Sequence, residues 1–300
     1  MRFGICTSGS FSQLNLEKEQ LYVEAKKHYD EVLLIDTRFV TYWFVRGSDK
    51  PIVIHKGMDI SNLNGLHVRS TNGREVSTSI LAHSMVACGC DIFDPADRFS
   101  IVFASKLLTS LSRFNKRVGS NTFITFNLSD SHSMLEKLWE ENYFPLISKP
   151  ITGKQGQGIK KLTDIKEAIT ASEIFFKERS DDDDIPLLIQ SFENFVSEYR
   201  VLVIDGKSLG IVQKINSSED QATRDSIRGR RFVEVAKNDV EDFVVSNVSN
   251  QGIVGVDVAI DDKGGYHIIE VNRAPMWRSF QKATNINVAE KIISQYINRK

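Results

Sequence analysis

Two short segments in the last fifth of the chain constrain the fold more than any other part of the sequence. Residues 255–260 (Gly-Val-Asp-Val-Ala-Ile) and 266–272 (Tyr-His-Ile-Ile-Glu-Val-Asn) are rich in β-branched residues and alternate with a period of two, which predicts a pair of strands. With residues 262–265 as a four-residue hairpin loop, Asp261 faces Tyr266, and Asp257 lies directly opposite Glu270. Asn272 then shares a face with both acids, because strand side chains alternate.

The predicted hairpin has a polar face and an apolar face. Opposed Cβ atoms lie about 5 Å apart, so Asp257 and Glu270 repel each other unless something neutralises them. A hard divalent cation with oxygen ligands would do so. The alternative is a solvated face that carries two acids. The other face is expected to pack on the core, and its members are Val256, Val258, Ile260, Ile269 and Val271.

Composition indicates an ordinary globular protein. The chain has 300 residues, a net charge of −1 and 41% hydrophobic residues, and no apolar run approaches the ~20 residues of a membrane span. We therefore expect neither nucleic acid nor a membrane as a partner. Three cysteines (Cys6, Cys88 and Cys90) do not suggest a disulfide framework or a zinc site. The first residues resemble a strand rather than a signal peptide, so we expect a cytoplasmic protein.

The first 95 residues are predicted to form a small open α/β domain. Residues 2–6 and 32–36 read as strands that flank a helix at about 14–29, a βαβ unit typical of a parallel sheet. Short strands are expected at 41–45 and 51–55, a helix at 74–88 and a return strand at 91–94. The loop at 7–10 (Thr-Ser-Gly-Ser) could bind an anion at a helix start, although it lacks the GxGxxG spacing of a dinucleotide site.

Residues 96–300 alternate between helical and strand patterns without an internal repeat. Helices are expected at about 99–118, 131–142, 164–177 and 240–250, and from an Asn287 cap onward. Strands are expected at 122–126, 144–149, 159–162, 186–190, 197–205 and 208–214, besides the hairpin. Residues 216–231 are polar, basic and without pattern, which is typical of a mobile loop. The acidic run at 181–184 is interpreted as a solvated loop.

A glycine-rich segment at 149–158 is the second informative feature. Gly153, Gly156 and Gly158 would let backbone N–H groups approach an anion. A Walker loop or a dinucleotide fingerprint would open a helix, whereas a strand is expected here, and Lys149 precedes the glycines instead of following them. What remains is a strand–turn–strand flap with a lysine at its base. A flexible hairpin turn is the alternative.

Two further segments carry polar groups suited to a nucleotide. Residues 189–193 (Ile-Gln-Ser-Phe-Glu) read as a strand end that leads into a connection between two lobes. Such a hinge commonly exposes backbone groups and an apolar wall to a purine. Residues 224–229, together with Lys214, offer cations suited to a polyphosphate, although surface solvation is the alternative for any single arginine.

In this order, these elements resemble the ATP-grasp superfamily, and within it the branch of the ribosomal-protein glutamate ligase. The segment 269–275 (Ile-Glu-Val-Asn-Arg-Ala-Pro), followed by 280–289 (Phe-Gln-Lys-Ala-Thr-Asn-Ile-Asn-Val-Ala), is similar to that branch's C-terminal signature. The resemblance implies an α/β (α+β) ATP-grasp fold at 96–300, with a flap-bearing lobe at about 96–185 and a metal-binding lobe at about 186–300. It also implies a pre-ATP-grasp domain at 1–95.

The resemblance also implies roles for individual residues. Asp257, Glu270 and Asn272 would hold Mg²⁺, typically two ions, with Mn²⁺ as an alternative. Arg200 and Arg228 are candidates to stabilise an acyl phosphate and a tetrahedral oxyanion. The implied nucleotide-binding positions are Lys106, Lys149, Gly153, Gly156, Gly158, Gln190, Ser191, Phe192, Glu198, Lys214, Arg224 and Ser226.

The implied activity is ATP-dependent ligation of a carboxylate to an amine, through an acyl phosphate, with release of ADP and phosphate. The acceptor could be an amino acid, a peptide or a protein, and homo-oligomer formation stays open. Two other hypotheses are a nucleotide-binding regulatory module that ligates nothing and a small-molecule kinase on the same scaffold. The sequence departs from the family at 276–277, where Met-Trp follows Pro275 in place of a glycine, and in the basic loop. Trp277 could contact a peptide, but packing is the favoured interpretation.

Overall fold

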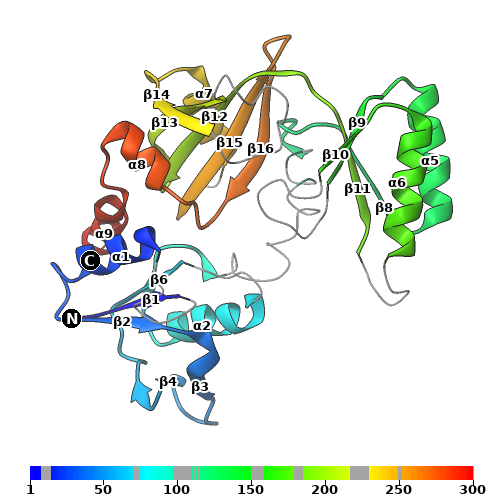
Figure 1. Ribbon diagram of the computed structural model, residues 1–300. Coiled ribbons are helices and arrows are strands. Elements are labelled where there is room, and N and C mark those ends of the chain that lie inside the picture. Colours follow the sequence, from blue (N-terminus) through cyan, green and yellow to red (C-terminus); the bar gives the residue numbers. More distant parts are fainter. Residues whose placement is uncertain are drawn as a thin grey trace.

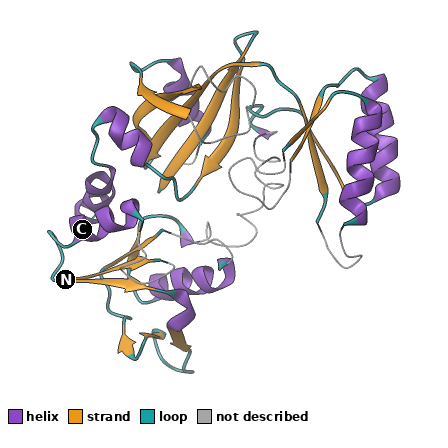
Figure 2. Ribbon diagram, in the orientation of Figure 1, coloured by secondary structure: helices purple, strands orange, loops and turns teal. Residues whose placement is uncertain are grey.

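The structure is a computed structural model, and parts of the chain lie outside what it describes. The residues described are 1–7, 15–69, 74–96, 110, 113, 115–149, 159–178, 185–216, 230–248 and 252–299, with only the backbone described at 216 and 230. Over these residues the chain forms both helices and strands, in a mixed order (Figures 1 and 2). None of the helices in this part of the chain is long and apolar enough to span a bilayer.

The N-terminal region is built on a parallel sheet in the order β2-β1-β6-β7. Its strands are β1 (Arg2–Cys6), β2 (Glu31–Ile35), β6 (Gly65–Val68) and β7 (Asp91–Ile92), and its helices are α1 (Leu16–Ala25) and α2 (Glu75–Ala87). The predicted βαβ unit of β1, α1 and β2 is confirmed. Strand β6 was not predicted, because all four of its residues are buried and so show no alternation of polar and apolar positions.

The two expected short strands belong to a separate sheet. Strands β3 (Val40–Trp43), β4 (Ile52–His55) and β5 (Met58–Asp59) form a three-stranded antiparallel unit. It follows the short 3-10 helix η2 (Thr37–Phe39) and projects from the region below α2 (Figure 1).

A second lobe contains an antiparallel sheet in the order β10-β9-β11-β8. Its strands are β8 (Thr122–Thr125), β9 (Leu146–Lys149), β10 (Lys160–Leu162) and β11 (Leu187–Ser191). Helices α5 (Leu128–Glu140) and α6 (Ile165–Lys177) lie together on one side of it (Figure 1). Each helix begins after an Asn or Asp whose side chain accepts a backbone N–H of the first turn, as N-caps do. Strands β9 and β10, which flank the glycine-rich segment, pair as predicted.

The third sheet is antiparallel, in the order β14-β13-β12-β15-β16. Its strands are β12 (Phe195–Ile204), β13 (Lys207–Asn216), β14 (Arg230–Glu234), β15 (Ile253–Asp261) and β16 (Tyr266–Asn272), and α7 (Asp239–Asn247) packs on it. Strand β14 was not predicted, since its arginines resemble the end of the polar loop. The chain passes from β11 to β12 within residues 192–194. The predicted connection between two lobes is therefore confirmed.

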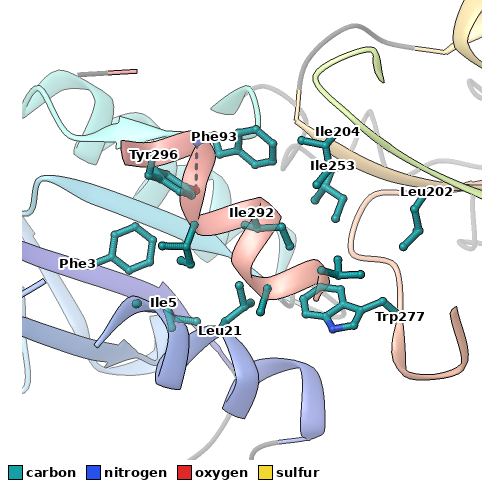
Figure 3. Packing of buried hydrophobic residues seen from close by; sticks show 14 of the residues in the cluster. Phe3, Ile5, Leu21, Phe93, Leu202, Ile204, Ile253, Trp277, Ile292 and Tyr296 are labelled. Atoms are coloured by element: carbon teal, nitrogen blue, oxygen red, sulfur yellow. Dashed lines mark hydrogen bonds between the residues drawn. The ribbon is translucent and has the colours of Figure 1, made fainter. Parts of the chain in front are cut away.

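One hydrophobic core joins the N-terminal region to the third sheet. Helices α8 (Arg278–Thr284) and α9 (Val288–Asn298) follow β16, and α9 packs beside α1 (Figure 1). Tyr296 of α9 contacts the Phe3 ring edge-on, with centroids 4.9 Å apart, and its hydroxyl donates to Leu66 O at 2.9 Å. Trp277 is fully buried in the same core (Figure 3), so its interpretation as a packing residue is confirmed.

Candidate functional site

The hairpin of β15 and β16 places Asp257 opposite Glu270 and Gly255 opposite Asn272, so the predicted juxtaposition of the three polar residues is confirmed. The turn that leads to it differs from the expectation. Ile260, not Asp261, faces Tyr266, and Asp261 N donates to Gly265 O at 3.0 Å. The loop therefore has three residues, and Gly264 at φ 82° takes the left-handed position that such loops need.

A bulge between the turn and the site restores the register. Pairing shifts between Asp257 and Val258, so that Ile269 is an extra residue on β16. The core position expected for Ile269 is wrong for this reason: Ile268 fills the core instead, and Ile269 is half-buried. A four-residue loop with a regular ladder and a three-residue loop with a bulge give the same pairing at Asp257. The sequence pattern could not separate them.

The bulge is held from outside the hairpin. Ile268 N donates to Val118 O at 2.8 Å, and the Arg113 guanidinium donates to Ile269 O at 2.7 Å and to Ile268 O at 3.3 Å. Burial lowers the pKa of Arg113, while the nearby Glu270 carboxylate acts in the opposite direction. Arg113 was not predicted as part of the site, and no signal in the sequence distinguishes it from other arginines.

Asp257 is 6% exposed and is neutralised by two cations from the neighbouring strands. Arg200, directly opposite on β12, donates Nε to Oδ1 at 2.7 Å and an NH2 to Oδ2 at 2.9 Å. Lys214 Nζ lies 2.8 Å from Oδ2. Burial alone would raise the pKa of Asp257, but Arg200 and Lys214 outweigh it and hold this pKa below its ordinary value. Arg200 and Lys214 thus supply part of the neutralisation that was expected from a metal ion.

The other two predicted metal ligands are more accessible. Glu270 is exposed and Asn272 is half-buried. Among the described residues, no group of three or more His, Cys, Asp and Glu side chains is placed to hold a metal. The set here is two carboxylates and one amide on a shared strand face. Such oxygen donors, completed by water and phosphate oxygens, fit Mg²⁺.

The edge of the second lobe carries the described nucleotide-binding candidates. Lys149, at the end of β9, donates Nζ to Gln190 Oε1 at 2.7 Å. Gln190 Nε2 in turn donates to Thr122 Oγ1 at 2.8 Å. This chain fixes the position of the Lys149 ammonium next to the start of the glycine-rich segment. Thr122 was not predicted as part of this arrangement.

The connection between β11 and β12 is also ordered by contacts. Phe192 N donates to Pro145 O at 3.0 Å, and Lys161 Nζ lies 3.8 Å from the centroid of the Phe192 ring, a cation–π geometry. The Ser191 hydroxyl donates to Glu193 Oε1 at 2.8 Å. Glu198, the predicted ribose partner, faces Lys214 across the strands, with 4.0 Å between its Oε2 and Lys214 Nζ.

Seven predicted site residues lie outside the described residues, so their roles stay predictions. They are Lys106, Gly153, Gly156, Gly158, Arg224, Ser226 and Arg228.

The segment after Asn272 turns tightly against the site. A Cβ added to Gly255 would lie 2.6 Å from Pro275 Cβ, so only glycine lets this turn approach the strand. Arg69, from the end of β6, donates to Pro275 O at 2.7 Å, and its guanidinium lies 4.4 Å from the Trp277 ring centroid. Arg69 was not predicted, because its strand was not.

The model of a known protein family matches most of the chain. Residues 105–296 match the model of the RimK-like ATP-grasp domain. The chain belongs to this family.

The relatives of this RimK-like chain are distant. It is 28% identical over 166 residues to the glutamate–LysW ligase ArgX of Sulfolobus acidocaldarius, a match covering 54% of this chain and 58% of the relative. It is 32% identical over 162 residues to a probable alpha-L-glutamate ligase of Legionella pneumophila, covering 52% and 51%. The chain thus spans little more than half the length of these relatives.

Solved structures extend the fold comparison to the whole chain. The ATP-grasp ligase PsnB complexed with a minimal precursor superposes with a TM-score of 0.72 at 16% identity, covering 99% of each chain. PsnB with a phosphomimetic variant of this precursor, Mg and ADP superposes with a TM-score of 0.70 at 15% identity, covering 99% of this chain and 97% of the other. At these identities the likeness shows the ATP-grasp fold.

Proposed function

We propose that this chain is an ATP-dependent carboxylate–amine ligase that forms an amide or peptide bond. The observation that carries the proposal is the placement of Asp257, Glu270 and Asn272 on one face of the β15–β16 hairpin, in a chain of the RimK-like ATP-grasp family. The names of its relatives, which are glutamate ligases, support the reaction class. For the same reason glutamate is the first substrate to test, both as the carboxylate and as the amine.

The residues that would hold Mg²⁺ are Asp257, Glu270 and Asn272, and bound Mg²⁺ would offset the charge of the nucleotide phosphates. PsnB, solved with Mg and ADP, supports this ligand pair on the same fold. Gln190 orients Lys149, so that its ammonium can approach a phosphate without a search among rotamers. Phe192, with its ring fixed by Lys161, offers an apolar wall for the base.

The proposed reaction has two steps. An oxygen of the substrate carboxylate attacks the γ-phosphorus of ATP, which gives an acyl phosphate and ADP. The amine nitrogen then attacks the acyl carbon, phosphate leaves, and the nitrogen loses a proton. Arg200 lies in the buried site next to Asp257, where its charge can stabilise the negative oxygens of both steps. The reaction requires no covalent nucleophile on the protein.

The test is ADP release from the purified protein with Mg²⁺ and ATP against a panel of amino acids and peptides, with mass spectrometry of the products. A ligase gives free phosphate and a product lighter by one water than its two substrates together. A small-molecule kinase gives a stable phosphorylated product instead, and a regulatory module gives no acceptor-dependent ADP. In Glu270→Ala, ligation should be abolished while the fold is retained. Near-wild-type turnover in this variant would contradict the metal assignment.

A further inference from the structure

A second polar site lies at the carboxyl edge of the N-terminal parallel sheet. In this sheet β2 pairs with one edge of β1, and β6 pairs with the opposite edge. The connections that leave β1 and enter β6 therefore run to opposite sides, so the order of the strands reverses between β1 and β6. In open α/β sheets, ligands bind outside the carboxyl ends of the strands at such a point. The strand ends lie side by side, and Arg69 N donates to Cys6 O at 3.1 Å.

Two buried polar side chains at this edge have donors that find no partner among the described residues. Thr7 follows β1 and is 2% exposed, and Arg69 follows β6 and is 5% exposed. Within the part of the chain that the structure describes, the Thr7 hydroxyl and the Arg69 Nε have no hydrogen-bond partner. Buried polar groups are almost always paired. Two unpaired donors on adjacent strand ends therefore indicate a missing acceptor.

The charges around these donors favour an anion. Lys18, in the first turn of α1, is 7% exposed. Burial lowers the pKa of Lys18, and the nearby charges of Arg69 and Arg74 lower it further. A cation at a helix N-terminus also opposes the helix dipole. The charged form of Lys18 is therefore disfavoured despite the nearby Glu17 carboxylate, and a bound anion would relieve the repulsion from Arg69 and Arg74.

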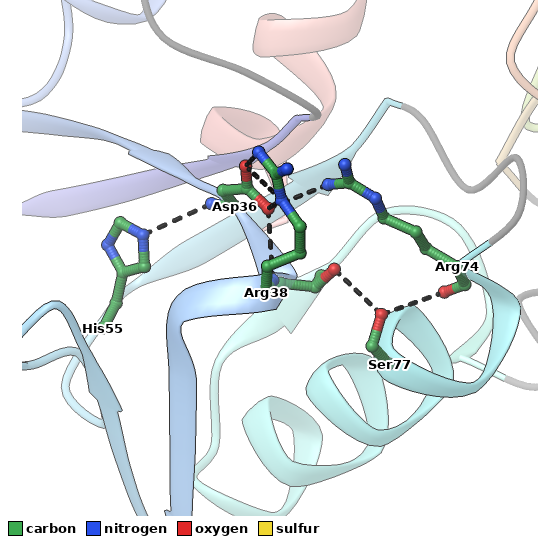
Figure 4. A network of polar contacts seen from close by, with 6 residues as sticks. Asp36, Arg38, His55, Arg74 and Ser77 are labelled. Carbon is green, nitrogen blue, oxygen red and sulfur yellow. Dashed lines mark hydrogen bonds and ion pairs between the residues drawn. The ribbon is translucent and has the colours of Figure 1, made fainter.

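The neighbouring acids offset only part of this positive charge. Asp36 is held by Arg38 and Arg74 at 2.7 and 2.8 Å (Figure 4). Glu17 and Asp94 lie near Arg69, and their carboxylates already accept backbone N–H groups of Arg278 and Ile253. Among the described residues, the charged side chains that act electrostatically on Lys18, Asp36 or Arg69 comprise, with these three, four bases and three acids; they are Glu17, Lys18, Asp36, Arg38, Arg69, Arg74 and Asp94. One excess charge suits a carboxylate better than a doubly charged phosphate.

The site adjoins the metal-binding hairpin. The Arg69 guanidinium that carries the unpaired Nε also donates to Pro275 O, three residues beyond Asn272. We propose that Thr7, Lys18 and Arg69 form a carboxylate subsite. It would hold the free carboxylate of an amino-acid substrate, while the reacting group of that substrate lies at the hairpin. This inference rests on the proposed ligase function for the nature of its ligand.

Two variants test the subsite without disturbing Arg69, which also packs on Trp277. Lys18→Met removes the charge and keeps the stem, and Thr7→Val replaces an unpaired hydroxyl by a methyl group of similar size. The control is Lys26→Met, which removes an exposed lysine at the other end of α1. If the two subsite residues served stability alone, both variants would have a lowered melting temperature. We expect melting temperatures equal to or above that of the wild type.

The probes are L-glutamate, L-aspartate and L-alanine, and the three corresponding α-carboxamides, titrated calorimetrically into the intact protein with Mg²⁺ and ADP. At least one of the three acids should bind the wild type and the Lys26→Met control with equal affinity. The same acid should bind each subsite variant about tenfold more weakly, as expected for loss of one charge-assisted hydrogen bond. The α-carboxamides should bind the wild type about as weakly as the acids bind the variants. The proposal is overturned if no acid binds the wild type, or if the subsite variants bind it as tightly.

Binding of Mg²⁺ and ADP, measured in the same samples, separates this proposal from the proposed function. If the wild type binds Mg²⁺ and ADP but binds the acids no more tightly than their α-carboxamides, the subsite is rejected and the ligase proposal is not. Absence of nucleotide binding in the wild type rejects the ligase.

Discussion

Replacing Asp257 by Asn should destabilise the protein strongly, whereas the same neutralisation at Glu270 should not. Asp257 is buried and forms a two-point contact with Arg200 at 2.7 and 2.9 Å, besides its contact with Lys214 at 2.8 Å. In the Asn variant, the half-buried Arg200 loses its two-point partner and the buried Lys214 keeps only the more distant Glu198 at 4.0 Å. One carboxylate oxygen is also replaced by an NH2 that faces other donors.

Removing one partner of a buried ion pair costs about 3–5 kcal/mol, which is a large part of the ~5–15 kcal/mol that stabilises a typical domain. Glu270 is exposed, so Glu270→Gln should change the free energy of unfolding by no more than ~0.5 kcal/mol. The assay is urea-induced unfolding of both variants without nucleotide. The control is Asp242→Asn, which breaks an ion pair to Lys237 whose two side chains are each 70% exposed, and it should cost at most ~1 kcal/mol.

The reasoning is refuted if Asp257→Asn unfolds within ~1 kcal/mol of the control. It is refuted equally if Glu270→Gln is as destabilising as Asp257→Asn, since the two acids would then not differ in their environments as the structure describes.

Three further predictions follow from the packing of the site and of the N-terminal region. Arg113→Met should lower kcat by at least tenfold and cost about 1.5–3 kcal/mol of stability, because it removes the donors that hold the bulge next to Glu270. Steady-state kinetics measures the first effect and urea unfolding the second. An unchanged kcat in a folded variant would contradict the role of the bulge. Gly255→Ala should lower the free energy of unfolding by about 1–3 kcal/mol, because the added methyl group would collide with Pro275. An unchanged melting temperature would contradict the need for glycine at this position. Asp36 has a pKa lowered to about 2, because Arg38 and Arg74 outweigh the opposing effect of burial. Its stabilisation is therefore present above the ordinary aspartate pKa and lost as the pH falls from about 4 to 2. Asp36→Asn should flatten the pH dependence of unfolding in that window, and an unchanged profile would contradict the pairing.

The hairpin shows how far the sequence could lead. Alternation within residues 255–260 and 266–272 is a local property, so the strands and the shared face of Asp257, Glu270 and Asn272 could be predicted from it. The loop length and the compensating bulge could not, since they depend on Gly264 taking a left-handed conformation and on the distant Arg113 and Val118.

Other parts of the fold and of the site could not be predicted, because they depend on burial or on contacts between distant segments. Strand β6 is buried at all four positions and therefore lacks a polar pattern, and with it Arg69 was overlooked. The neutralisation of Asp257 by Arg200 follows from the pairing of β12 with β15, which joins segments 57 residues apart. Spacing within one segment carries no information on such a partner.

Calorimetric titration of ATP into the protein, with and without Mg²⁺, tests the central claim most directly when the wild type is compared with Glu270→Gln. The account predicts saturable, Mg²⁺-dependent binding in the wild type and a loss of at least tenfold in affinity in a variant that stays folded. Equal affinity in the two proteins, or binding that does not depend on Mg²⁺, would contradict it.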